Sequence, residues 1–351
     1  MPQGESGNRS VRNGATGSFS AAALAATAPQ SSRNTAIGVL CGLTVVLIWA
    51  GWAVATRFAV TTTLRPPDVA FIRFAVATLL LLPVLLRNRS GGEAGGGLEL
   101  RRIGLAKVAI MVCGAGAPFI MLCTTAMIFA PASHTGTLMV GAMPIFVALM
   151  SALFFGERFD RPQLVGFAAV IVGVLGIGGN ALLHDRAGIG VWRGDLLLLL
   201  SGAFFAAYTL ALRRSGVTPW QGAAIVNTIS FVGFAPIYLL FLPSNLLVAP
   251  WHDTAIQILA QGVGAAVLAL FFYGEAVRRL GAPRAAILGS LTPGVAALLA
   301  VPALGETLDA TTVIGIVLVT AGVMLVSGIL SKRRTAAIAA APAPVRSGIG
   351  S

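Results

Sequence analysis

The chain has 351 residues, of which 56% are hydrophobic and only 10% are charged, and its formal net charge is +12. So apolar a composition excludes an ordinary soluble domain and predicts an all-α protein that crosses a membrane many times. Three cysteines lie in apolar stretches without metal-site spacing, and no catalytic, zinc or phosphate-loop signature is present. The sequence therefore predicts no cofactor, no metal and no enzyme activity.

Two polar tails flank the apolar part of the chain. Residues 1–34 are rich in Gly, Ser and Ala, and are predicted to form a disordered cytoplasmic tail. A signal peptide is the alternative, because residues 21–26 are a short Ala-rich run. Residues 335–351 are predicted to form a second disordered cytoplasmic tail.

Ten apolar segments of 18–23 residues lie between the tails. Each is long enough to cross a hydrocarbon core of about 30 Å as a helix. The predicted spans are residues 36–57, 68–87, 105–127, 134–155, 163–181, 195–212, 221–243, 256–277, 285–304 and 311–330.

The positions of Lys and Arg predict the orientation. With the N-terminus in the cytoplasm, most of the 24 Lys and Arg residues fall on the inside, and the outer loops hold only Arg65, Arg186 and Arg193. Cytoplasmic loops of membrane proteins carry such an excess of positive charge. The pattern places both termini in the cytoplasm and explains the net charge without a nucleic-acid partner.

One stretch of the sequence occurs twice. Five residue types recur at a constant offset of 149 positions, which indicates two related halves, predicted to be residues 36–181 and 195–330. With five spans in each half, the second half enters the membrane in the opposite sense. The repeated residues are Pro144, Gly156, Glu157, Gly166 and Gly173, matched by Pro293, Gly305, Glu306, Gly315 and Gly322.

Each repeated residue type has a physical interpretation. A proline within a span removes a backbone donor, so we expect Pro144 and Pro293 to kink their helices beside protein or a cavity. Glu157 and Glu306 follow 13 residues later, about 20 Å along a helix, and are predicted to cap and anchor helix ends. The glycine pairs lie on one face of the next helix, where small residues let backbones approach closely.

These motifs resemble the EamA family of the drug/metabolite transporter superfamily. The resemblance covers roughly residues 36–330 and includes, besides the two repeated motifs, the tryptophan-bearing stretch 47–51 and the pair Arg73-Phe74. It implies ten spans as two inverted five-helix repeats, with a central cavity and alternating access. Pro302, with Leu153 as its counterpart, and Glu275 depart from the family pattern, so substrate is not transferred by analogy.

Arg73 is the leading candidate for contact with a substrate, because a cation within a span usually faces a cavity or a partner. The alternatives are a structural ion pair and a side chain that reaches the outer interface. Glu275 is a second charged candidate. It lies three residues before Arg278, so an interfacial ion pair is its alternative interpretation.

Aromatic and amide side chains complete the predicted cavity. Aromatic side chains within spans also face lipid or pack between helices, and polar amides also bridge helices. The remaining cavity candidates are Trp49, Trp52, Tyr208, Asn227, Gln261 and Tyr273.

The inverted repeat predicts a secondary transporter of small molecules in the plasma (inner) membrane, with lipid around it. The resemblance implies export of metabolites, of amino-acid-like or of drug-like solutes. A channel-like facilitator and a polytopic membrane enzyme are the alternatives. The sequence leaves the coupling ion open, and it leaves the oligomeric state open between a monomer and a homodimer.

Overall fold

The computed structural model describes residues 32–87, 100–183 and 190–327. Within these ranges the chain is helical, with short connections and no strand. The predicted tail at residues 335–351, and all but the last three residues of the predicted tail at residues 1–34, lie outside the described residues.

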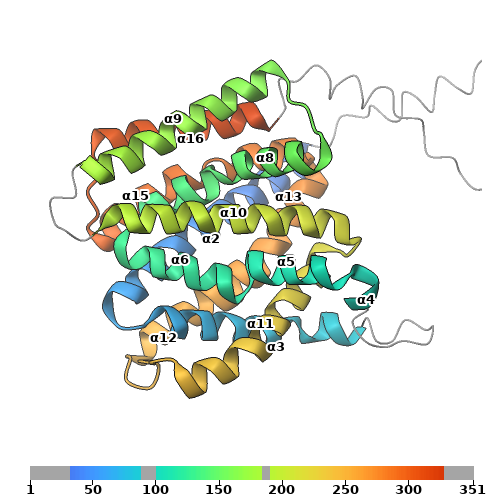
Figure 1. Ribbon diagram of the computed structural model, residues 1–351, viewed down its shortest axis with the longest axis vertical. Helices are drawn as coiled ribbons and strands as arrows, with labels where there is room; N and C mark the ends of the chain where they lie inside the picture. Colours follow the sequence, from blue (N-terminus) through green and yellow to red (C-terminus); the bar gives the residue numbers. More distant parts are fainter. Residues whose placement is uncertain (1–31, 88–99, 184–189, 328–351) are drawn as a thin grey trace, which may run out of the picture.

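The helices follow one another with few intervening residues (Figure 1). In chain order they are α2 (Ser32–Thr62), α3 (Pro66–Arg87), α4 (Leu100–Ile103), α5 (Leu105–Ala115), α6 (Ala117–Phe129), α7 (Ala132–His134), η1 (Thr135–Gly141), α8 (Met143–Phe155), α9 (Arg161–Leu183), α10 (Val191–Ser215), α11 (Pro219–Phe241), α12 (Trp251–Gln257), η2 (Ile258–Leu268), α13 (Ala269–Leu280), α14 (Ala282–Gly289), α15 (Thr292–Leu304) and α16 (Ala310–Val326). The segments η1 and η2 are π-helical.

Nine helical stretches in the described residues are long and apolar enough to cross a membrane. They coincide with the first nine predicted spans. The tenth predicted span corresponds to α16, an apolar helix of 17 residues within the described ranges, which is at the lower limit of the length that spans a bilayer. The count of ten spans therefore stays a prediction.

Both repeated prolines lie where a helix is interrupted. Pro144 is in the first turn of α8, directly after the π-helical segment η1 and the turn at Ala142. Pro293 is in the first turn of α15, after α14 ends at Gly289. A proline has no N–H, and the first turn is the place in a helix where that donor is not needed. The chain therefore restarts its helix at each proline.

The Gly-Glu motif ends a helix in both halves. Gly156 has φ 65°, and its N–H donates to the carbonyl of Ala152 at 3.0 Å while the N–H of Glu157 donates to Ser151 at 3.3 Å. The same two bonds recur at the motif that begins with Gly305, where φ is 66°. A left-handed residue is required to turn the chain back in this way, which is why glycine occupies the position.

The repeated glycine pairs pack helices α9 and α16 against each other, and Figure 1 shows the two helices side by side. A Cβ added at Gly166 would lie 2.7 Å from the carbonyl oxygen of Gly322, and one added at Gly173 would lie 2.9 Å from that of Gly315. The pairing 166 with 322 and 173 with 315 makes the two helices antiparallel. The close approach expected from these glycines is therefore present, and it joins the two halves.

Several other contacts between the halves are reciprocal. Helix α2 of the first half packs against α13 and α15 of the second half. Helix α10 of the second half packs in the same way against α5, α6 and α8 of the first half. Helices α3 and α11 pack against each other. The first helix of each half thus lies among the third and fourth spans of the other half.

Gly166→Ala should lower the thermal unfolding midpoint by several degrees, because overpacking against a backbone costs about 1–3 kcal/mol. Gly176→Ala, on the same helix, is the matched control, since nothing lies within 4 Å of its added Cβ. We expect Gly176→Ala to leave the midpoint unchanged or slightly raised. Unfolding of the detergent-purified protein, followed by intrinsic fluorescence, measures both. Equal midpoints for the two variants would contradict the backbone contact.

Candidate functional site

Two adjoining cavities lie between the halves, with volumes of about 160 Å³ and 150 Å³. We call them cavity 1 and cavity 2. Four residues line both: Trp49 of α2, Arg73 of α3, Phe205 of α10 and Ala265 of η2. The halves each contribute two of these residues, so the cavities lie where the halves meet.

Most of the predicted cavity residues line these cavities. Trp52 joins Trp49 and Arg73 in the wall of cavity 1. Cavity 2 is lined in addition by Tyr208, Asn227 and Tyr273. The first three of these residues belong to the first half and the other three to the second half. Trp49 and Trp52 lie on one face of α2, as their spacing of three residues suggested.

Arg73 is held by one hydrogen bond and has donors to spare. Its Nη1 donates to Oε1 of Gln261 at 3.2 Å, while its Nε is buried without a hydrogen-bond partner. Among the described residues that line the two cavities, Arg73 is the one that carries a charge. A planar guanidinium presents several donors in a fork that matches a carboxylate. The arrangement is suited to an anionic group of a bound molecule.

Gln261 positions two of the cavity side chains from behind the wall. It is 0% exposed and is not among the lining residues of either cavity. Its Oε1 accepts from Trp52 Nε1 at 2.6 Å as well as from Arg73, and its Nε2 donates to Thr56 Oγ1 at 2.7 Å. The amide therefore acts as a bridge between helices, one of the two roles that the sequence allowed.

The aromatic lining of cavity 2 is packed in pairs. The ring centroids of Trp49 and Tyr273 are 5.8 Å apart, and those of Phe205 and Tyr208 are 5.2 Å apart. Asn227 donates from Nδ2 to the carbonyl of Ala223 at 2.8 Å, which leaves its amide oxygen available. These surfaces suit an apolar or amphipathic molecule.

Glu275 lies away from the two cavities. Its carboxylate pairs with Arg278 and, at 2.7 Å, with Arg279 on the same helix. Pairs spaced by three and four residues on a helix surface are common. The structure therefore agrees with the ion-pair interpretation of Glu275 and does not bring this residue to the other cavity candidates.

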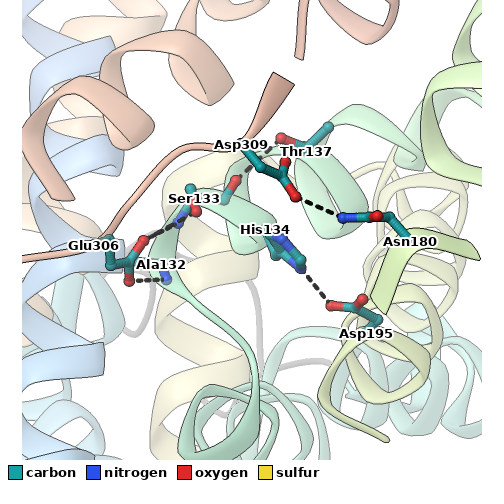
Figure 2. A network of polar contacts seen from close by, with 8 residues as sticks. All are labelled: Ala132, Ser133, His134, Thr137, Asn180, Asp195, Glu306 and Asp309. Carbon is teal, nitrogen blue, oxygen red and sulfur yellow. Dashed lines mark hydrogen bonds and ion pairs between the residues drawn. The ribbon is translucent and has the colours of Figure 1, made fainter. Parts of the chain in front are cut away.

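The two repeated glutamates lie at opposite ends of the helix bundle, which we call the Glu157 end and the Glu306 end. Glu157 is exposed after α8. Glu306, after α15, accepts hydrogen bonds from the N–H groups of Ala132 at 2.6 Å and Ser133 at 3.2 Å, and from Ser133 Oγ at 2.9 Å (Figure 2). Glu306 thus caps the start of a helix in the other half, a contact that sequence alone did not indicate.

Further polar pairs join helices at the Glu306 end. His134 Nδ1 lies 2.7 Å from Asp195 Oδ1, and Asn180 Nδ2 donates to Asp309 at 2.6 Å (Figure 2). Burial opposes ionisation of Asp309, but hydrogen bonds from Thr312 and Asn180 hold the pKa of its carboxyl below the ordinary value. The Asp309 carboxylate remains charged at neutral pH as the N-cap of α16.

Several lining residues were missed by the sequence analysis. Phe205 stands 156 positions after Trp49, so the correspondence between the first and sixth spans was a signal for it. Phe119, Thr135 and Met139 also line cavity 1, and the sequence holds no comparable signal for them. Their exposure to the cavity depends on helix rotation, and the apolar spans have little amphipathic pattern from which rotation can be read.

Apolar helices long enough to cross a membrane, with a cavity between two halves and a charged side chain in its wall, define a multi-pass membrane transporter. The sequence profile of the EamA-like transporter family matches residues 36–179 and 192–328. The chain belongs to this family.

Named relatives are transporters as well. An "Uncharacterized transporter" of Bacillus subtilis is 22% identical over 76% of this chain and 85% of its own length. A "Probable terminal-alkyne amino-acid exporter" of Streptantibioticus cattleyicolor is 27% identical over 75% of this chain and 88% of its own length. A "Probable amino-acid metabolite efflux pump" of Salmonella typhimurium is 27% identical over 58% of this chain and 70% of its own length.

A solved crystal structure shares the fold with a TM-score of 0.55 and 22% identity, over 84% of this chain and 97% of the other. Family and relatives together identify a multi-pass membrane protein that transports small molecules and is not an enzyme.

Gln261→Met should destabilise the protein by about 2 kcal/mol, because it leaves Trp52 Nε1 without a partner and removes the hydrogen bonds of Gln261 with Thr56 Oγ1 and Arg73. Gln257→Met is the matched control on the same transmembrane stretch. Gln257 is also 0% exposed, but within the described residues its side chain makes one hydrogen bond, from Nε2 to the carbonyl of Ala55, and its Oε1 has no partner. Thermal unfolding in detergent compares them. An equal loss in both variants would mean that Gln261 does not organise the cavity wall.

Proposed function

We propose that this protein is a secondary exporter of amphipathic small molecules that carry a carboxylate, such as amino-acid-like metabolites. The observation that carries the proposal is Arg73, a guanidinium with an unpartnered Nε in the wall of cavities whose other described lining residues are uncharged. In surroundings of low dielectric, the attraction between this cation and a carboxylate is stronger than in water. The rings nearby supply contact for the apolar body of the solute.

The proposed mechanism is alternating access by two inverted five-helix repeats. The antiparallel packing of α9 on α16 and the reciprocal packing of α2 and α10 support an inverted relation between the halves. Helix α11 begins at the Glu157 end. Ala223 and Asn227, which line cavity 2 in the first part of this helix, therefore lie toward that end. With the excess of Lys and Arg marking the cytoplasmic side of the plasma membrane, the Glu157 end faces inward and both termini are cytoplasmic.

Export is the direction that the names of the relatives support, since two of them are called an exporter and an efflux pump. The sequence holds no ATPase motif, so the proposed energy source is an ion gradient or solute exchange. A site at the junction of two repeats is the usual arrangement in secondary transporters.

Counterflow in proteoliposomes tests the function. Liposomes preloaded with unlabelled L-leucine should accumulate labelled L-leucine transiently and with saturation, since an alternating-access carrier exchanges solute across the membrane. A channel would give flux proportional to concentration and no transient accumulation. Proportional flux would therefore replace the carrier with the channel-like alternative.

Arg73→Ala should raise the half-saturation concentration for L-leucine about tenfold or more, because a charge-assisted hydrogen bond to a carboxylate contributes roughly 1.5–3 kcal/mol. Arg73→Lys should restore only part of this, because Lys lacks the planar fork. Inhibition by L-leucinamide, which has no carboxylate, is the control and should change little. Equal losses for the acid and the amide would show that Arg73 acts on the fold and not on the carboxylate.

Single cysteines at Arg158 and Thr307, one position after each repeated glutamate, should report the inverted topology. Both side chains are exposed, and the three native cysteines would first be replaced by serine. We expect an impermeant thiol reagent to modify Arg158→Cys from the cytoplasmic face and Thr307→Cys from the outer face. Modification of both from one face would rule out the inverted repeat.

A further inference from the structure

The carboxylate of Glu306 ties the second half of the protein to the first. Gly305 turns the chain back after α15, so that Glu306 reaches the first residues of the fourth transmembrane stretch (Figure 2). There it accepts three hydrogen bonds from Ala132 and Ser133. A carboxylate at a helix N-terminus is favoured both by the exposed N–H groups and by the helix dipole.

Arg57 strengthens the same corner. Its guanidinium donates to the carbonyl of Met127, close enough to Glu306 for the two charges to attract. Glu306 is only half-buried, so its hydrogen bonds can be broken without leaving a charge in hydrocarbon. A contact that is strong when made and tolerable when broken is suited to a gate.

At the Glu157 end the repeated glutamate forms no equivalent contact within the described residues, and the guanidinium of Arg214 over the ring of Phe155 links the halves there instead. Glu157 is exposed and, among the described residues, its carboxylate has no hydrogen-bond partner. The two ends of the molecule therefore differ at the very residue that the repeat makes equivalent.

The sequence gives a reason for this difference. The helix that faces Glu306 begins after Pro131, and the corresponding helix of the second half begins after Gly281. These two starts are 150 positions apart, whereas the repeated motif residues are 149 positions apart. The extra residue of the π-helical segment η1 accounts for the shift. Ser133 then corresponds to Pro283, which has neither an N–H nor a hydroxyl. The Glu157 end can offer fewer donors, so a contact there is weaker.

We propose that Glu306 is a gating residue: its hydrogen bonds to Ala132 and Ser133 hold the Glu306 end shut, and their release opens cavity 1 to that side. The inference rests on the proposed alternating access. In that cycle the asymmetry between the two glutamates favours the state in which the Glu306 contacts are made, as they are in this structure. Glu306 acts by positioning a helix and does not contact the solute.

Two reporter cysteines, placed in a variant without Cys41, Cys113 and Cys123, test the gate. Ala296→Cys reports on cavity 1, whose wall includes Ala296 on the helix that leads to Glu306. Ala223→Cys reports on cavity 2 near the Glu157 end. Each is combined with Glu306→Gln or, as the matched control, with Glu157→Gln. Rates of reaction with an impermeant thiol reagent are measured from each side of proteoliposomes.

Glu306→Gln should raise the rate at Ala296→Cys from the Glu306 side about tenfold or more, since it weakens charge-assisted hydrogen bonds. It should lower the rate at Ala223→Cys from the Glu157 side, because the equilibrium shifts toward the opposite state. Glu157→Gln should change neither rate. Ser133→Ala, which removes one of the three hydrogen bonds, should give a smaller change in the same direction.

An unchanged rate at Ala296→Cys in Glu306→Gln would overturn the gate. Equal increases in Glu306→Gln and Glu157→Gln would also overturn it, since they would indicate general loosening of the fold. If the rate at Ala296→Cys rises while that at Ala223→Cys stays constant, Glu306 does close its end, but the two ends are not coupled. That result supports the gate and refutes the alternating-access function, so the two failures are distinguishable.

Discussion

A polar group within the hydrocarbon of a bilayer has no water to bind, so it must find its partner in the protein. This constraint explains where the irregular parts of the molecule lie. The helix breaks before Pro144 and Pro293 and the π-helical segments η1 and η2 occur in helices that pack between the halves or line the cavities. The same constraint joins Arg73 and Gln261, because a cation and an amide in adjacent spans satisfy each other. The cavity wall is therefore built from the groups that the fold must keep away from lipid.

The two halves contain the same structural motifs, but their repeated glutamates make different contacts. Both end their fourth helix with a left-handed glycine followed by a glutamate, and both place paired glycines on the next helix. Yet Glu306 is bound to the other half and Glu157 is exposed. Such near equivalence suits the proposed alternating access, since two arrangements of similar free energy interconvert only if neither is strongly preferred. This difference accompanies the one additional residue that the first half has between the helix start after Pro131 and Pro144.

The cavity wall combines one guanidinium with aromatic rings. This combination affects the release of a solute as well as its binding. A charge-assisted contact in a dry site orients a carboxylate strongly, whereas the rings accept apolar bodies of different shapes. Arg73 is already bonded to Gln261, which limits how tightly it can hold a solute. In the proposed transport cycle the solute must be released on the far side, so a site that binds too firmly would slow the cycle. The observed wall suits exchange of a class of solutes more than retention of one.

The sequence by itself determined the membrane class, the positions of nine helical spans in the described residues and the repeated motif residues, because these depend on local composition and on periodicity. It also singled out Trp49, Trp52, Arg73, Tyr208, Asn227 and Tyr273, whose side chains are unusual within apolar spans. Only the tertiary structure decided that Glu275 pairs along its own helix and that Gln261 lies behind the wall. It alone placed Phe119 and Thr135 at the cavity and brought Glu306 to Ala132. Those outcomes depend on helix rotation and on contacts between residues more than a hundred positions apart, and uniformly apolar helices carry little pattern that specifies either.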